Sequence, residues 1–152
     1  MENGLKIHQD HHKGTIEYHT NNHETGETLH RAVIDTHTPS KGKLPFTHIT
    51  QSEVVRKSGN DLPKNHAKNI TYNHFKNQKH PLVSSEEQYD DGHHMWKQLS
   101  HRALRDGYHV YHYDGSKLHE TTPTNIDKHL KNSFGKSKEF EHKHMIISHH
   151  KL

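Results

Sequence analysis

Histidine is the residue type with the most chemistry to offer in this chain. There are 22 histidines among 152 residues, and there is no cysteine. An imidazole exchanges protons close to neutral pH and binds transition metals through either ring nitrogen. Without cysteine, the chain has no disulfide, no thiolate metal ligand and no thiol nucleophile. Acid–base or metal chemistry would therefore fall to imidazoles, carboxylates and hydroxyls.

The His-x-Thr motif, which occurs in pairs in two-histidine phosphoesterases, is present three times. The motifs begin at His23, His48 and His119. About three such motifs are expected by chance in a chain with this many His, Ser and Thr residues, and a short motif alone is weak evidence. The motifs therefore do not predict a phosphoesterase.

Metal ligands usually recur at fixed spacings, and the histidines of this chain do not. Adjacent pairs occur at 11–12, 93–94 and 149–150, but neighbouring side chains point apart on both helices and strands. The zinc-binding sequence His-Glu-x-x-His does not occur. From spacing alone, we predict no metal site.

The charge balance argues against nucleic acid as the partner. Lys and Arg number 21, Asp and Glu number 18, and the formal net charge is +3. This excess is small and the acidic residues are interleaved with the basic ones, as on a solvated surface. No run of residues is apolar enough for a leader peptide or a membrane span, so we expect a cytoplasmic protein without membrane contact.

The low hydrophobic content of the chain limits the core around which its helices and strands can fold. Only 26% of the residues are hydrophobic. Leu, Ile, Val and Phe together stay below about 20%, a level associated with disorder when the net charge is also high. Here the net charge is low and the apolar residues are clustered in periodic segments. We therefore predict a folded domain with a small core and a very polar surface.

The clearest elements lie between His80 and Gly115. Leu82 and Val83 belong to a short apolar run that stops at Ser84 and Ser85, and Ser85 is a good N-cap for a helix. The apolar residues that follow form one helical stripe: Met95, Trp96, Leu99, Ala103 and Leu104. Asp106-Gly107 is a typical helix end, and residues 108–113 are rich in strand formers. The pattern predicts two parallel strands with a covering helix, and it places Trp96 in the core.

The rest of the chain supplies further strands and two more helices. We predict a hairpin over 14–35, a strand over 46–55, a helix over 64–77, a helix after Pro123 and a last strand within 139–148. Residues 1–13 have few apolar side chains and are expected to be loosely docked. The order β-β-β-α-β-α-β-α-β predicts a single α/β domain over 1–152, with a mixed β-sheet, an N-terminal hairpin and flanking helices.

This order of elements resembles the GNAT (Gcn5-related N-acetyltransferase) superfamily. The segment Leu82-Val83-Ser84-Ser85-Glu86-Glu87-Gln88-Tyr89, continued by Gly92, Met95-Trp96 and Leu99, is similar to small GNAT-like proteins of phages and mobile elements. The resemblance implies that acetyl-CoA is the cofactor. It also implies that the strand before the long helix splays from its neighbour and binds the pantetheine arm, and that backbone amides of the loop after that strand bind the pyrophosphate at a helix N-terminus.

Carried onto this sequence, the resemblance assigns six cofactor-binding residues. These are Val55, Arg56, Ser58, Gly59, Asn60 and Ser84. Two positions depart from the family. Asp61 stands where a second Gly or Ala belongs, and Trp96 stands where many members have a tyrosine that protonates the leaving CoA thiolate. The resemblance therefore assigns no catalytic residue.

Three kinds of function follow from the resemblance and its departures. The first is an acyltransferase that moves acetyl from acetyl-CoA to an amine on a protein or a small molecule. The second is a non-catalytic GNAT-like phage protein that binds a host factor, in which case it would act in the host cytoplasm. The third is a component of a virion or of its assembly.

Overall fold

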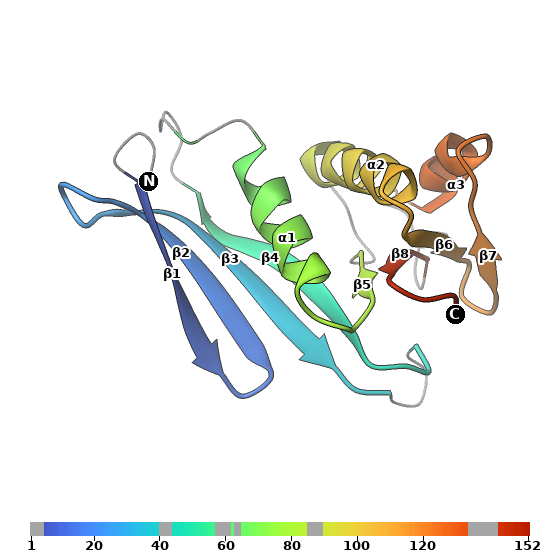
Figure 1. Ribbon diagram of the computed structural model, residues 1–152, viewed down its shortest axis with the longest axis horizontal. Helices are drawn as coiled ribbons and strands as arrows, with labels where there is room; N and C mark the ends of the chain where they lie inside the picture. The colour runs from blue at the N-terminus through green and yellow to red at the C-terminus, as the bar shows by residue number, and fades with distance from the viewer. Residues whose placement is uncertain (1–4, 40–43, 57–61, 63–64, 85–89, 134–142) are drawn as a thin grey trace. The chain divides into compact units, whose positions relative to one another are not determined.

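The computed structural model describes residues 5–39, 44–56, 62, 65–84, 90–133 and 143–152. In these residues the chain is mixed α/β, as predicted, with eight strands and three helices (Figure 1). The elements fall into two compact units, Met1–Asn77 and Gln78–Leu152. Each unit is described by itself below.

The first unit contains four antiparallel strands in the order β1-β2-β3-β4. They are β1 (Leu5–His12), β2 (Thr15–Asn22), β3 (Thr28–His37) and β4 (His48–Arg56). The predicted hairpin over 14–35 is confirmed as the β2–β3 pair. The predicted strand over 46–55 is confirmed as β4, shifted by one or two residues at its ends.

The expectation that residues 1–13 are loosely docked is wrong for residues 5–12, which form strand β1. Every residue of β1 pairs with β2, from Leu5 opposite Asn22 to His12 opposite Thr15. Gly14 closes the turn between them with φ of 68°, a left-handed conformation that glycine adopts at little cost. Backbone pairing with β2, rather than burial of apolar side chains, is what orders this segment.

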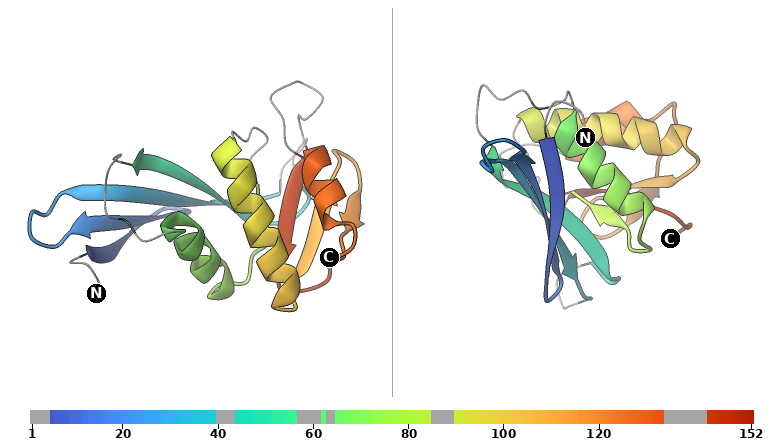
Figure 2. Two further views of the ribbon diagram at one scale, coloured as in Figure 1. Left: turned by 90° about the horizontal axis from the view of Figure 1, so that it is seen from above. Right: turned by 60° about the vertical axis from the view of Figure 1, so that its left-hand side comes forward.

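Helix α1 (His66–Lys76) lies along one face of this sheet, as Figures 1 and 2 show. Ile70, Thr71 and Phe75 are buried, whereas Ala67 is only half-buried. Under the helix, Ala32 and Ile34 of β3 are almost fully buried. The predicted start of this helix, at residue 64, lies outside the described residues.

The second unit contains four strands in the order β5-β8-β6-β7 and two helices. The strands are β5 (Leu82–Val83), β6 (His109–Tyr113), β7 (Leu118–Glu120) and β8 (His144–Ser148), and the helices are α2 (Asp90–Arg105) and α3 (Ile126–Ser133). Both β5 and β6 run antiparallel to β8, so they are parallel to each other, as predicted. They are not neighbours, however, because β8 lies between them. The short strand β7 was not predicted.

The core of the second unit contains the apolar stripe of α2. Trp96 is 4% exposed, and Leu99 and Ala103 are fully buried, which confirms the predicted core positions. Met95 and Leu104, at the margins of the stripe, are half-buried. Helices α2 and α3 contact each other and both contact β6 and β8. The three central residues of β8 and both residues of β5 complete this core.

The C-terminus of α2 is capped as the sequence predicts. Gly107 has φ of 89°, its N–H donates to the carbonyl of Leu104 at 3.2 Å, and the N–H of Tyr108 donates to the carbonyl of Ala103 at 2.9 Å. This pair of bonds is the Schellman motif, which satisfies carbonyls that the helix itself leaves open. The predicted N-cap of this helix, Ser85, lies outside the described residues.

Helix α3 begins three residues later than the sequence predicts. Thr122 and Asn125 form the preceding turn, in which the side chain of each accepts a hydrogen bond from the other's backbone N–H, at 2.7 and 3.3 Å. Thr122 thus caps this turn, but the regular helix starts at Ile126.

Candidate functional site

The residues predicted to bind CoA are only partly described by the structure. Val55 and Arg56 close β4, where their backbones pair with Arg31 and His30 of β3. Ser58, Gly59 and Asn60, together with the departing residue Asp61, lie outside the described residues. The pyrophosphate-binding loop therefore remains a prediction from the sequence.

Ser84, the last of the predicted cofactor residues, has a structural role at the end of β5. It is 1% exposed. Its hydroxyl oxygen accepts the N–H of Met145 at 2.9 Å, and its own N–H donates to the carbonyl of Met145 at 2.9 Å. Its carbonyl accepts a hydrogen bond from His144 Nδ1 at 2.7 Å. These three bonds continue the β5–β8 pairing beyond the end of β5.

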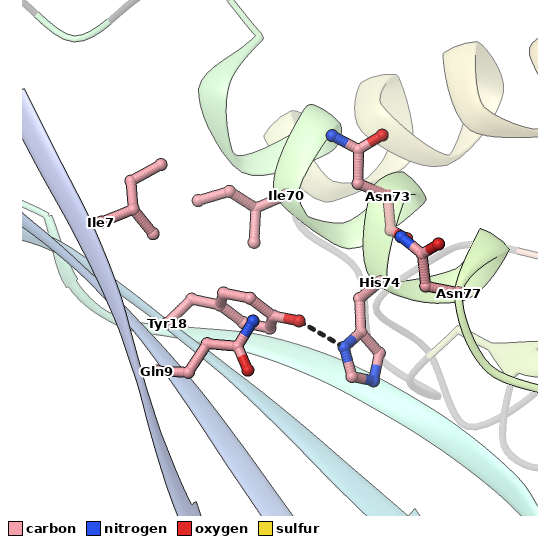
Figure 3. A pocket seen from close by; sticks show the side chains of 7 residues that line it. All are labelled: Ile7, Gln9, Tyr18, Ile70, Asn73, His74 and Asn77. Carbon is pink, nitrogen blue, oxygen red and sulfur yellow. Dashed lines mark hydrogen bonds between the residues drawn. The ribbon is translucent and has the colours of Figure 1, made fainter. Parts of the chain in front are cut away.

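A small open pocket lined by both polar and apolar side chains lies in the first unit, between the β1–β2 hairpin and α1. Its volume is about 210 Å³, and seven residues line it: Ile7, Gln9, Tyr18, Ile70, Asn73, His74 and Asn77 (Figure 3). Tyr18 of β2 and His74 of α1 face each other there, with the phenol oxygen 2.6 Å from His74 Nδ1. Strand alternation and helix periodicity bring these two side chains together although they are far apart in the sequence.

The Tyr18–His74 pair is neutral at neutral pH. Burial raises the pKa of the Tyr18 phenol. Burial also lowers the pKa of His74, and the nearby charge of protonated His11 lowers it further. The phenol can donate to Nδ1, which leaves Nε2 with a proton, or Nδ1 can donate to the phenol oxygen, which leaves the hydroxyl proton free. In the first arrangement the free donor is the Nε2–H group of His74, and in the second it is the hydroxyl of Tyr18. A change between the two arrangements would pass a proton through the pair.

The lining of this pocket fits a small uncharged polar group. Two isoleucines provide apolar surface, and the amides of Gln9, Asn73 and Asn77 provide donors and acceptors. The Asn77 amide nitrogen is held by the Asn73 carbonyl at 2.8 Å. At about 210 Å³ the pocket is smaller than the roughly 300–1,000 Å³ of drug-sized ligand sites. It could hold a side chain or a small metabolite, but not a whole nucleotide cofactor.

A second hydroxyl–imidazole bond anchors α1 beside the pocket. Thr20 Oγ1 of β2 lies 2.7 Å from His66 Nε2 at the start of α1. The ring of His66 meets the ring of His30 edge to face, with centroids 5.4 Å apart, and His30 is 1% exposed. Histidines at the two ends of α1 therefore tie the helix to β2.

Three histidines from three elements meet in the second unit. His112 of β6, His119 of β7 and His129 of α3 have ring centroids 5.3 to 6.1 Å apart. The Nδ1 atoms of His112 and His129 are 3.1 Å apart and share a hydrogen bond. Nε2 of His112 is shielded from solvent and makes no hydrogen bond within the described part of the chain. We call these three residues the imidazole cluster.

The pKa of His112 is lowered to about 4, and burial is the largest cause. The charges of His129, His119 and Lys143 contribute to this lowering, while Asp114 opposes it. Burial is also the main cause of the lowered pKa of His129. His112 and His129, the two members of the cluster that share a hydrogen bond, are therefore neutral at pH 7.

Asp114 fixes the outer member of this cluster. Its carboxylate accepts a hydrogen bond from His119 Nε2 at 2.7 Å and from the backbone N–H groups of Ser116 and Lys117. The bond from His119 is the largest cause that holds the pKa of the Asp114 carboxyl well below its usual range, and the two backbone bonds add to it. The two backbone bonds also close the turn between β6 and β7.

The three His-x-Thr motifs stand in different settings. His23 is exposed in the β2–β3 turn. His48 is buried, and its Nδ1 donates to the Phe46 carbonyl at 3.1 Å. Thr121, the hydroxyl residue of the third motif, donates to the Val110 carbonyl in the interior. The contacts of His48 and Thr121 hold the neighbouring loop and strand in place.

Sequence reasoning missed both the pocket and the imidazole cluster. Each is built from side chains that lie on different elements, with no fixed spacing along the chain. The available signal was period-two alternation, which puts Tyr18 and Thr20 on one face of a strand. The orientation of α1 against that face was needed as well.

Comparison with protein-family models, with curated proteins and with solved structures finds no match to this chain. Within the described residues, none of the helices combines the length and the apolar character that crossing a membrane requires.

Proposed function

We propose that the protein is a GNAT-like N-acetyltransferase that moves acetyl from acetyl-CoA to an amine. One observation carries the proposal: the order of elements from β1 to β6, in which four antiparallel strands are followed by α1, β5, α2 and β6. The family resemblance rests on this order from β2 onward, and β1 is one strand more than the sequence predicts. Strand β4 also runs to Arg56, immediately before the segment with the predicted pyrophosphate-binding amides.

In the proposed reaction the amine nitrogen attacks the thioester carbonyl, and the CoA thiolate leaves and takes up a proton. The amine must be neutral to attack, and the thiolate must find an acid. Trp96 stands at the family position of the phenolic acid, and an indole N–H does not release its proton near neutral pH. The proton therefore comes from water or from a group outside that position.

The experiment that tests this proposal is calorimetric titration of the metal-free protein with acetyl-CoA and with CoA. We expect saturable binding of both. Asp61→Gly should tighten it about fivefold, because removing a like charge near a phosphate is worth about 1 kcal/mol. Glu24→Gly, which removes one acidic residue from the exposed β2–β3 turn, should leave the affinity unchanged. The absence of binding at millimolar acetyl-CoA would overturn the proposal.

The second candidate is a GNAT-like protein that binds without catalysis. The observation that favours it is the burial of Trp96, at 4% exposure, where an exposed acid would be needed. The two candidates differ in turnover. An acetyltransferase releases free CoA thiol when acetyl-CoA and a mixture of amines are supplied, whereas a binding protein takes up CoA or a protein partner and releases no thiol above the blank.

A further inference from the structure

Two histidines and an aspartate converge on the β1–β2 hairpin. His8 and His19 are directly opposite each other in the register, and Asp10 lies two residues beyond His8 on the same face of β1. The two imidazole rings are stacked, with centroids 4.8 Å apart and an angle of 3° between their planes. We call His8, Asp10 and His19 the hairpin triad. It lies on the opposite face of the sheet from Tyr18 and Thr20, which contact α1.

The ligand atoms of the hairpin triad already have nearly the spacing of a metal site. Asp10 Oδ2 is 3.2 Å from His19 Nε2 and 3.9 Å from His8 Nε2, and the three atoms all lie within 4.8 Å of one another. Two ligands bound to one tetrahedral zinc at about 2.0–2.1 Å are themselves about 3.3 Å apart. Both distances from His8 Nε2, to Asp10 and to His19, have to shorten, and the exposed His8 ring has to tilt out of the stack so that its in-plane lone pair points at the ion.

Two polar atoms at this site have unused bonding capacity. His19 Nε2 is shielded from solvent and, despite its 3.2 Å approach to Asp10, makes no aligned hydrogen bond in the described part of the structure. The side-chain oxygen of Asn21 is likewise shielded and, among the described residues, makes no hydrogen bond. A shielded ring nitrogen that lies close to a carboxylate without an aligned hydrogen bond can offer its lone pair to a metal ion.

Asn21 is placed to orient His8 for a metal. Its amide nitrogen lies 3.3 Å from His8 Nδ1. The oxygen and nitrogen of an amide exchange places when the group turns by 180°. After that turn the Asn21 oxygen accepts the Nδ1–H of His8, which leaves Nε2 of His8 unprotonated and directed at Asp10. Metal-bound histidines are commonly held in this way by a second residue.

Asp10 is the carboxylate available to a cation. Glu17, the other acid on this face, is already engaged by Arg31 at 3.3 Å and by His12 at 3.4 Å, and it also lies 3.6 Å from His19 Nε2. Asp10 lies opposite Glu17 in the strand pairing, has half of its side chain exposed and forms its ion pairs in the described residues with the two histidines of the hairpin triad. Its exposure also gives water access to the remaining coordination positions.

We propose that the hairpin triad binds one divalent transition-metal ion of the zinc class, through Nε2 of His8 and His19 and the carboxylate of Asp10. Imidazole and carboxylate ligands suit Zn²⁺, Ni²⁺ and Cu²⁺. Two of the ligands are on β1 and one is on β2, so the ion ties the outermost strand of the first unit's sheet to its neighbour. The site is independent of the proposed acetyl transfer and goes beyond it.

The test has to separate this site from weak binding by the other histidines. Zinc titration of the metal-free full chain against a competing chelator should reveal one site per chain that binds at least about tenfold more tightly than the rest. His19→Gln and Asp10→Asn should each remove that site. Asn21→Ala, which removes only the orienting contact, should weaken it about tenfold. His23→Gln, on the exposed β2–β3 turn, should leave it intact.

A measurement on the unchanged protein removes the risk that a variant misfolds. One equivalent of paramagnetic Ni²⁺ or Co²⁺ should broaden or shift the ring signals of His8 and His19 before those of other histidines in the NMR spectrum. The proposal is overturned if the ring signals of all histidines change together. It is equally overturned if zinc binds the folded Asp10→Asn and His23→Gln proteins with the same affinity.

Discussion

At the scale of single residues, the imidazoles of this protein have contrasting hydrogen-bond partners. His74 bonds to the Tyr18 phenol at 2.6 Å, and His119 bonds to the Asp114 carboxylate at 2.7 Å. His112 instead shares a hydrogen bond with another imidazole and is buried. These settings act on protonation in opposite directions, since a carboxylate favours the imidazolium and burial disfavours it.

The buried His112 gives a prediction about acid stability. Its folded pKa of about 4 lies below the ordinary value of 6.5. Its stabilising effect is therefore complete above pH 6.5 and is lost as the pH falls from 6.5 towards 4, because the unfolded chain takes up the proton first. When the pH falls from 7.5 to 4.5, the free energy of unfolding of the parent protein should decrease. For His112→Leu we expect this decrease to be roughly 2–3 kcal/mol smaller.

Urea unfolding at a series of pH values measures this difference. His23→Gln, at an exposed turn position, serves as the matched control and should follow the pH profile of the parent protein. If His112→Leu loses as much stability as the parent over this window, His112 is protonated in the folded protein and the assigned burial effect is wrong.

At the scale of elements, the sequence was most informative where one segment carries its own pattern. The stripe from Met95 to Leu104 predicted α2, and Gly107 predicted its end, because periodicity and capping are local properties. In the same way, turn residues between two apolar arms predicted the β2–β3 hairpin. In these segments local preference and tertiary structure agree.

Elements that depend on a distant partner could not be predicted. Strand β1 has the polar sequence LKIHQDHH, and only pairing with β2 makes it a strand. The position of β8 between β5 and β6 depends on which strands pair, which no single segment encodes. The hairpin triad was missed for the same reason: His8 and Asp10 have strand spacing, but His19 joins them only in the register of the β1–β2 pair.

The Schellman cap of α2 gives a prediction at this scale. Gly107→Ala should destabilise the protein by about 1–2 kcal/mol, because an L-residue at φ of 89° is strained. An added Cβ would meet no atom within 4 Å, so the backbone conformation is the only cost. Gly107→Asn should lose less, since asparagine tolerates left-handed conformations. The shift in urea midpoint measures both, and equal losses for Ala and Asn would contradict this explanation.

At the scale of the whole molecule, the histidines dominate the response to acid. The formal net charge is +3 with neutral histidines, and complete protonation would add up to 22 positive charges. An ordinary imidazole titrates near pH ~6.5, so much of this change falls between pH 7.5 and 5.5. Accumulated like charge destabilises a compact state through self-repulsion, and salt screens that repulsion.

Burial adds a contribution to this response that salt does not screen. Burial lowers the pKa of His74, His112 and His129. Each therefore contributes stability that is present above pH 6.5 and is lost as the pH falls towards its folded pKa. Ion pairs such as His101–Asp127, 2.8 Å apart on the surface, act in the opposite direction but contribute little because they are exposed.

We therefore expect the melting temperature of the metal-free protein to fall clearly between pH 7.5 and 5.5 at low salt. In 0.5 M NaCl the fall should be smaller but should persist, because screening removes the repulsion between exposed imidazolium groups and leaves the cost of protonating buried ones. Thermal scans followed by circular dichroism, at both salt concentrations and with a chelator present, measure the two contributions. A flat profile at low salt would contradict this expectation, since it would mean that pairing with carboxylates compensates each added charge.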